Sequence, residues 1–185
     1  MKLIVGLGNP GKRYQGTRHN VGYLALSELA SRFPKEKPKA KFRGDLLDVR
    51  LGNEQILLLC PTTYMNRSGL SVAETVKFYK IELNDILIVC DDLNLPFGKL
   101  RLRAEGSSGG QKGLADIIRM LGTESVSRLR IGIGSPPGRM DAADYVLMNF
   151  TEKERPELVV VLKQAADATE HWIGHGIQQT MNKYN

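Results

Sequence analysis

The sequence predicts a three-layer α/β fold, in which a mixed, twisted β-sheet is packed between α-helices. Short apolar runs alternate along the chain with longer segments whose apolar residues recur at helical spacing, which is typical of parallel strands joined by helices. Two of the runs, Leu46–Leu51 and Gln55–Cys60, are separated by a Gly-Asn turn and therefore indicate an antiparallel hairpin. A chain of 185 residues fits one domain, which we expect to span residues 1–185.

The first half of the chain is predicted to supply one strand and one helix before the hairpin, and a second helix after it. Leu3–Val5 is a buried strand, and apolar spacing predicts a helix over 21–33. The basic, proline-containing stretch 35–41 is expected to be a solvated loop. After the hairpin, apolar residues at helical spacing predict a helix over Ser68–Lys80.

The second half is predicted to add three strands and two helices. Asp85–Asp91 is an apolar strand that ends in acid, and Lys99–Arg103 alternates basic with apolar residues, so that its cations share one face. A helix is expected over Leu114–Leu121, followed by a strand over Arg128–Gly134, whose two arginines also share a face.

A long helix is predicted near the C-terminus. The residues Thr151–Glu154 have the spacing of a capping box, and the apolar residues after them recur at helical spacing as far as Trp172. Gly174-His175-Gly176 is expected to end this helix, and a short polar tail follows.

Composition narrows the choice of partner and compartment. The net charge is +6 and the sequence pI is about 9.4, which favours a polyanionic partner. No apolar run reaches membrane-spanning length and no signal-peptide pattern is found, so we expect a protein that binds no membrane. Cys60 and Cys90 each end an apolar strand, and we expect two buried thiols in a reducing cytoplasm.

Two glycine-rich motifs imitate nucleotide-binding loops without meeting their requirements. Gly6-x-Gly8-x-x-Gly11 has the dinucleotide-binding spacing, but the next helix begins about ten residues later, and the acidic residue of a second strand is missing. The stretch 106–113 lacks the Gly-Lys-Ser/Thr triplet of a phosphate loop. Its backbone N–H groups nevertheless precede a helix and suit an anion or a developing oxyanion.

A candidate site is predicted in the loops at the carboxyl ends of the strands, where the loops of α/β sheets gather. Its side chains are Asn9, Tyr14, His19, Asn20, Asn66 and Asp91. A neutral histidine can take a proton from water near pH 7, an acid can fix its tautomer, and amides can hold water or an oxyanion. Asp91 and Asp92 are both candidates for that acid. This set is sufficient to hydrolyse an activated ester, and we expect neither a metal nor a cofactor.

Five separate segments resemble the bacterial peptidyl-tRNA hydrolase family, in the same order and over essentially the whole chain. They are IVGLGNPGKRYQGTRHNVGY, PTTYMNRSG, DDLNLPFGKLRLR, GSSGGQKGLADI and RLRIGIGSP. The resemblance implies a metal-free esterase that cuts the bond between a peptide and the 3′-terminal ribose of tRNA and recycles tRNA during translation. It also implies a monomer in the cytoplasm. The alternative is an RNA-binding relative that kept the fold and lost turnover.

The resemblance also implies roles for individual residues. His19 would be the general base and Asp91 its partner, while Asn9 and Asn66 would bind the peptide end and stabilise the tetrahedral intermediate. Met65 is expected to be an exposed, adaptable apolar contact. The implied substrate contacts are Tyr14, Asn20, Tyr64, Met65, Gln111 and Lys112. The implied contacts to tRNA phosphates are Lys99, Arg101, Arg103 and Arg130.

One departure from the family pattern lies in the glycine-rich loop. The family usually carries a His-Asn pair where this chain has Gln111-Lys112. An ammonium group only donates hydrogen bonds, so Lys112 cannot copy an amide. We expect either that Lys112 contacts an anionic part of the substrate or that Gln111 supplies the amide.

Overall fold

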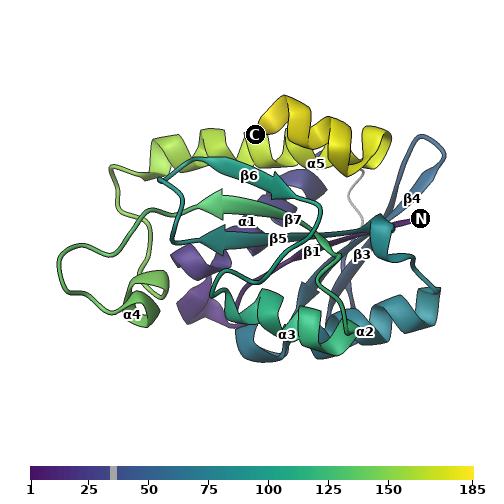
Figure 1. The fold of residues 1–185 in the computed structure, drawn as a ribbon, viewed down its shortest axis with the longest axis horizontal. Helices are drawn as coiled ribbons and strands as arrows, with labels where there is room; N and C mark the ends of the chain where they lie inside the picture. Colours follow the sequence, from purple (N-terminus) through teal and green to yellow (C-terminus); the bar gives the residue numbers. More distant parts are fainter. Residues whose placement is uncertain (34–36) are drawn as a thin grey trace.

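The computed structural model describes residues 1–33 and 37–185, and its centre is a seven-stranded sheet with the order β2-β3-β4-β1-β5-β7-β6 (Figure 1). β1 (Lys2–Gly6) pairs in parallel with β4 (Glu54–Pro61) and with β5 (Ile86–Asp92). β5 also pairs in parallel with β7 (Ser127–Gly132). The carboxyl ends of these four strands therefore meet at one edge of the sheet.

Antiparallel pairs complete the sheet at both sides. β3 (Gly44–Leu51) pairs with β4, which confirms the predicted hairpin, and β6 (Leu100–Arg103) pairs with β7. β2 (Lys39–Lys41) pairs with β3 and corrects the expectation of a loop over 35–41. Residues 35 and 36 of that stretch lie outside the described residues. β2 is exposed along its whole length, so pairing with its neighbour, and not its own sequence, makes it a strand.

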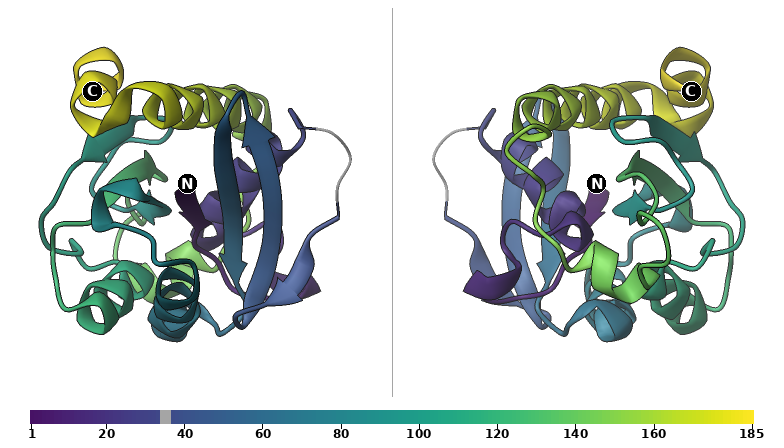
Figure 2. Two further views of the ribbon diagram at one scale, coloured as in Figure 1. Left: turned by 90° about the vertical axis from the view of Figure 1, so that its right-hand side faces the viewer. Right: turned by 90° about the vertical axis from the view of Figure 1, so that its left-hand side faces the viewer.

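Helices cover both faces of the sheet, as the sequence predicts (Figure 2). α1 (Val21–Ala30) and α5 (Arg155–Tyr184) lie on one face, while α2 (Ser68–Tyr79) and α3 (Lys112–Leu121) lie on the other. The short helix α4 (Ala142–Val146) was not predicted from the sequence. Single turns of 3-10 helix complete the fold, at Lys12–Tyr14, Arg18–Asn20, Met65–Arg67 and Leu83–Asp85.

Two hydrophobic clusters fill the spaces between the layers. In β1, Ile4 contributes to the cluster under α1 and α5, which surrounds Trp172, whereas Leu3 and Val5 contribute to the cluster under α2 and α3. Strand residues alternate between faces, and both faces of the central strands are covered. This is why the central strands are continuous apolar runs in the sequence.

The C-terminal segment confirms the predicted break in the helix at Gly176, but the predicted polar tail is wrong. Gly176 has a φ of 77° and kinks the helix, but helical structure resumes beyond it and runs to Tyr184. The Asn185 side chain then donates to the Leu102 carbonyl and accepts from the Leu102 N–H, at 3.1 and 2.7 Å, on strand β6. These contacts with β6 hold a second helical segment in place where a polar tail was expected. None of the helices in the described residues is long and apolar enough to cross a membrane.

Candidate active site

His19 and Asp91 form the centre of the site. His19 lies in the 3-10 turn that immediately precedes α1, and Asp91 is the penultimate residue of β5. Their Nδ1 and Oδ2 atoms are 2.7 Å apart, and the two side chains are 12% and 3% exposed. A hydrogen bond to a carboxylate places the imidazole proton on Nδ1, which leaves the Nε2 lone pair free to accept a proton.

The structure distinguishes the two candidate acids. Oδ1 of Asp92 accepts the Asn94 N–H at 2.8 Å, and its Oδ2 lies 2.9 Å from Nε of Arg130. Asp92 is thus committed to a turn and to an ion pair on the neighbouring strand. Asp91 is the acid that contacts the histidine.

Asn9 and Asn20 hold the first loop in shape. Asn20 is buried, and its carboxamide bonds both the N–H and the carbonyl of Asn9, at 2.8 and 2.9 Å. The Asn9 side-chain oxygen accepts the Met65 N–H at 2.8 Å, which joins the loops that follow β1 and β4. The Asn9 amino group remains as the donor of that side chain, whereas Asn20 is turned into the protein.

The loop after β4 presents its three predicted residues differently. Tyr64 is half exposed and has a positive φ of 62°, and Asn66 is exposed. Met65 is only 4% exposed, so the expectation of an exposed methionine is wrong. Its sulfur packs against Gly113, where an added Cβ would lie 2.5 Å away. Met65 therefore supports the loop from beneath.

Gln111 is buried and uses its whole carboxamide within the protein. Its Nε2 donates to Oδ1 of Asp91 at 3.0 Å and lies 3.1 Å from the Met65 sulfur, and its Oε1 accepts the Leu114 N–H at 2.7 Å. It is thus both the N-cap of α3 and a second partner of the acid that holds His19. Lys112, the first residue of α3, is exposed.

Arg18, which precedes His19 in the sequence, makes a buried ion pair that no sequence pattern predicted. Its guanidinium is buried, pairs with Glu154 at 2.9 Å and lies over the rings of Tyr145 and Phe150. Burial opposes ionisation of Glu154, but hydrogen bonds from Thr151 and Arg18 outweigh it and lower the Glu154 pKa. The hydrogen bonds between Thr151 and Glu154 also confirm the capping box. No local pattern predicts this pairing, because its partners are 136 residues apart.

The cations of β6 and β7 share one face, as the alternation predicts. Arg101 lies opposite Arg130 in the register, and Lys99 and Arg103 are exposed. Arg128, opposite Arg103, is buried instead and donates to the carbonyls of Gly106 and Glu124, at 2.6 and 3.2 Å. It therefore braces the glycine-rich loop and is not a surface cation.

Tyr14, the remaining residue of the predicted set, ends the 3-10 turn Lys12–Tyr14. It is partly exposed, and the Arg13 guanidinium lies 4.6 Å from the centre of its ring. Its side chain joins none of the hydrogen bonds around His19. Among residues 1–33 and 37–185, no group of three or more His, Cys, Asp or Glu side chains could hold a metal ion.

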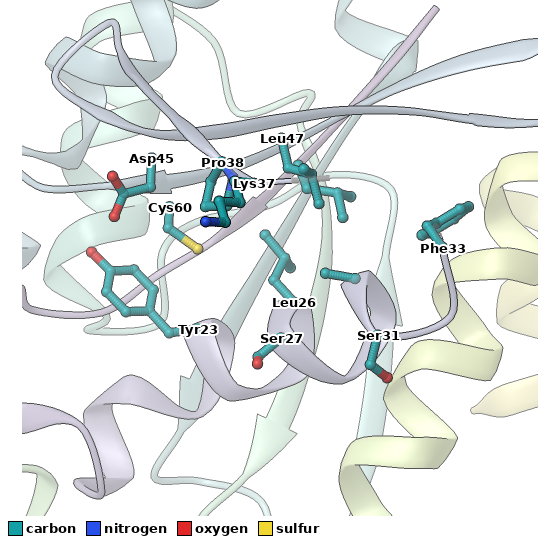
Figure 3. Close-up of a pocket in the computed structure, with 12 residues that line it drawn as sticks. Tyr23, Leu26, Ser27, Ser31, Phe33, Lys37, Pro38, Asp45, Leu47 and Cys60 are labelled. Carbon is teal, nitrogen blue, oxygen red and sulfur yellow. The ribbon is translucent and has the colours of Figure 1, made fainter. Parts of the chain in front are cut away.

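A pocket of about 650 Å³ lies away from His19, between α1 and strands β3 and β4 (Figure 3). Tyr23 and Leu26 line it from the helix, and Leu47 and Cys60 line it from the sheet. Burial, with a contribution from Asp45, raises the pKa of the Cys60 thiol to about 12. Cys60 is only partly buried, whereas Cys90 is fully buried, and both thiols are free.

The fold and this site together define an α/β protein of the hydrolase class, with a histidine–carboxylate pair at the carboxyl edge of a mixed sheet. The family model described as peptidyl-tRNA hydrolase matches residues 3–185. The chain belongs to the peptidyl-tRNA hydrolase family.

Individual relatives agree over the full chain. It is 50% identical to the peptidyl-tRNA hydrolase of Rhodopirellula baltica, covering 100% of this chain and 97% of that protein. It is 48% identical to that of Geobacillus thermodenitrificans, covering all of both. The crystal structure of peptidyl-tRNA hydrolase from Acinetobacter baumannii superposes with a TM-score of 0.92 at 36% identity, covering 100% of this chain and 94% of that one.

Proposed function

We propose that this protein hydrolyses the ester bond between a peptide and the 3′-terminal ribose of tRNA, and so recycles tRNA during translation. Family membership supports the reaction and its substrate. The observation that carries the mechanism is the 2.7 Å contact from His19 Nδ1 to Asp91, which leaves Nε2 as a base. We further propose that residues 1–185 act as one domain, as a monomer in the cytoplasm.

In the proposed mechanism, His19 activates water. The water oxygen attacks the ester carbonyl carbon while Nε2 of His19 accepts its proton, and Asp91 stabilises the resulting imidazolium. The tetrahedral intermediate collapses, the carbon–oxygen bond to ribose breaks, and the 3′-oxygen takes the proton back from His19. General-base assistance of this kind is worth about 10²–10⁴-fold in rate.

Two amides are proposed to hold the carbonyl and the peptide. The amino group of Asn9 is the available donor of a side chain whose oxygen is already fixed by Met65, so it can stabilise the developing oxyanion without reorganising. Asn66, the residue after Met65, is exposed and is proposed to bind the peptide end. Lys112, at the exposed N-terminus of α3, is proposed to contact an anionic part of the substrate.

Gln111 is proposed to act as a positioning residue. His19 binds one oxygen of Asp91 and Gln111 binds the other, so the carboxylate is held from both sides. Since its amide is fully used, Gln111 is not proposed to contact substrate directly. Under this proposal the glutamine supports the acid and the lysine faces the substrate, which is how we interpret the departure from the family pattern.

The cationic face of Lys99, Arg101 and Arg103 is proposed to meet tRNA phosphates. Arg130, whose charge is partly offset by Asp92, would contribute less. Under this proposal, Arg101→Ala combined with Arg103→Ala weakens tRNA binding. It also lowers the slope of log K against log salt concentration by about 0.9 for each lost phosphate contact, the value for a nucleic-acid duplex. An unchanged salt slope would place the tRNA on another surface.

A single-turnover assay with N-acetylaminoacyl-tRNA tests the activity. The parent protein should release the N-acetylamino acid both with and without EDTA, and His19→Ala should bind the tRNA but lose hydrolysis by at least about a hundredfold. Binding without cleavage by the parent protein would instead favour an RNA-binding relative. The intact His19–Asp91 pair gives no support to that alternative.

A further inference from the structure

A surface at the β2 side of the sheet combines aromatic rings with cations and takes no part in the site above. It is formed by two segments that are far apart in sequence, Lys41-Phe42-Arg43 and Lys77-Phe78-Tyr79-Lys80. In each segment the aromatic residues are bracketed by cations. We call this the aromatic–cationic surface. From it we infer that the protein has a second binding surface, which takes an unpaired RNA segment.

Ring contacts bring the two segments together. The ring of Phe42 lies 5.1 Å from that of Phe78 and 5.7 Å from that of Tyr79, and the last two are 4.9 Å apart. Phe42 and Tyr79 also pack on the core, but Phe78 is 64% exposed. A large ring held in a fixed position and open to solvent is a suitable platform for a base, because every base has a stacking face.

The backbone holds these residues in costly conformations. Among the described residues, only Phe42, Arg43, Tyr64 and Lys80 have a positive φ without being glycine. Three of these four belong to the aromatic–cationic surface, although Lys80 is the left-handed C-cap of α2, which is an ordinary way for a helix to end. Phe42 and Arg43 are the two central residues of the β2–β3 turn, where Asn-Gly is preferred and a bulky residue is disfavoured. Strain of this kind is typical of functional sites.

Charge at the surface favours an anionic partner. The two segments contain Lys41, Arg43, Lys77 and Lys80 and no acid, and all four side chains are exposed. Arg43 is offset by Glu74, whose Oε1 lies 2.7 Å from its Nε. Lysines on both sides of an exposed ring can follow the phosphates while a base stacks on Phe78. An uncharged apolar peptide would gain nothing from these cations.

The aromatic–cationic surface is separate from the β6 cations but connected to the site. β2 and β6 are opposite edges of the sheet. The carbonyl of Arg43 accepts hydrogen bonds from the N–H and hydroxyl of Thr62, at 2.8 and 3.0 Å, in the loop that carries Asn66. RNA bound here could therefore influence that loop, but the binding does not depend on the proposed hydrolysis.

A tryptophan placed at the stacking position provides a local test. Phe78→Trp keeps an aromatic ring, and Trp172, the native tryptophan, is fully buried and supplies a constant background. We expect an unstructured RNA oligonucleotide of about ten nucleotides to quench the new fluorescence at low salt. Val159→Trp, at an exposed position of α5, is the matched control and should not be quenched. Both variants should carry His19→Ala, so that the result is independent of turnover.

Two further measurements separate stacking from charge. Phe78→Ala should weaken oligonucleotide binding at this surface at least about fivefold, because it removes the stacking ring. Lys77→Gln combined with Lys80→Asn should lower the slope of log K against log salt concentration by about 1.4, because two phosphate contacts to a single strand are lost. Equal quenching by polyphosphate or by duplex RNA would overturn the inference, because neither offers an unpaired base. Absence of quenching at oligonucleotide concentrations that saturate the protein would overturn it as well.

Discussion

Replacing Gln111 tests whether Asp91, the proposed catalytic acid, is held from both sides. In Gln111→Ala, Asp91 loses the 3.0 Å hydrogen bond from Nε2, and α3 loses the 2.7 Å bond that caps its N-terminus. A hydrogen bond to a charged group contributes about 1.5–3 kcal/mol, and an N-cap about 1 kcal/mol. The unfolding free energy should therefore fall by about 3 kcal/mol. Because Asp91 is then free to turn away from His19, kcat should fall at least about tenfold.

A second variant separates the two roles of this side chain. Gln111→Glu keeps an oxygen for the Leu114 N–H but places a carboxylate, with no donor, against Asp91. It should keep the helix cap and still lose kcat. As a matched control, Asp141→Ala removes the 2.7 Å cap of α4 at an exposed loop, and it should lower stability by about 1 kcal/mol with kcat unchanged.

The measurements are urea unfolding followed by circular dichroism, and kcat and KM for N-acetylaminoacyl-tRNA. We expect kcat to fall and KM to change little, because Gln111 is proposed to position Asp91 and not to contact the substrate. If both Gln111 variants keep kcat within twofold of the parent while Gln111→Ala loses stability, Gln111 is only a helix cap. The positioning role would then be refuted, although the role of His19 would stand.

Three further predictions concern stability and reactivity. The pKa of Glu154 is lowered in the folded state, so its contribution to the unfolding free energy is fully present above the ordinary glutamate pKa of about 4.5 and is lost as pH falls through the folded value. Glu154→Gln should therefore flatten the acid dependence of the unfolding free energy. It should also lower that free energy by about 2 kcal/mol at pH 7, as measured by urea unfolding. Gly22→Ala should lower the unfolding free energy by about 3 kcal/mol in the same assay. Gly174→Ala, where an added Cβ meets nothing within 4 Å, should be neutral or slightly stabilising. Cys90 is fully buried and burial raises its pKa, so iodoacetamide at pH 8 should label it only after unfolding; labelling of the native protein would show that β5 opens.

The features that could be predicted from sequence are those set by local pattern. Ile56–Leu59 and the other apolar runs are central strands because both faces of the sheet are covered, and that requirement appears in the sequence itself. The positions of Asn9 and Asp91 follow directly, since a residue at the end of a parallel strand lies at the carboxyl edge whatever its neighbours are.

The features that escaped prediction depend on contacts between distant residues. Gln111 was one of two candidates, with Lys112, for the residue of this loop that contacts substrate, but its amide donates to Asp91, which is 20 residues away. Lys39–Lys41 carries no strand pattern and becomes β2 only by pairing with β3. Gly176 has a non-helical backbone, but helical structure resumes after it, because Asn185 is hydrogen-bonded to Leu102 of β6 and holds the last helical segment in place. Local propensity was overridden in each case by tertiary contacts.

The separation of His19 from Asp91 is set by how closely α1 approaches the sheet. Gly22 is the second residue of α1, and a Cβ there would collide with the Val89 carbonyl and lie 2.5 Å from the Leu7 nitrogen. A Cβ on Gly6 would lie 2.5 Å from the Gly22 carbonyl oxygen, so the approach requires glycine on both sides.

This contact also explains the glycine spacing that imitates a dinucleotide-binding loop. A Cβ on Gly8 would lie 2.7 Å from the Tyr23 ring. Gly6 and Gly8 are therefore needed for α1 to pack closely against the end of β1, and not for the approach of a pyrophosphate. His19 precedes Gly22 by three residues, and Asp91 follows Val89 by two. A helix that could not come this close would carry the imidazole away from its acid. Gly6 and Gly22 therefore set the 2.7 Å contact between His19 and Asp91 on which the proposed chemistry depends.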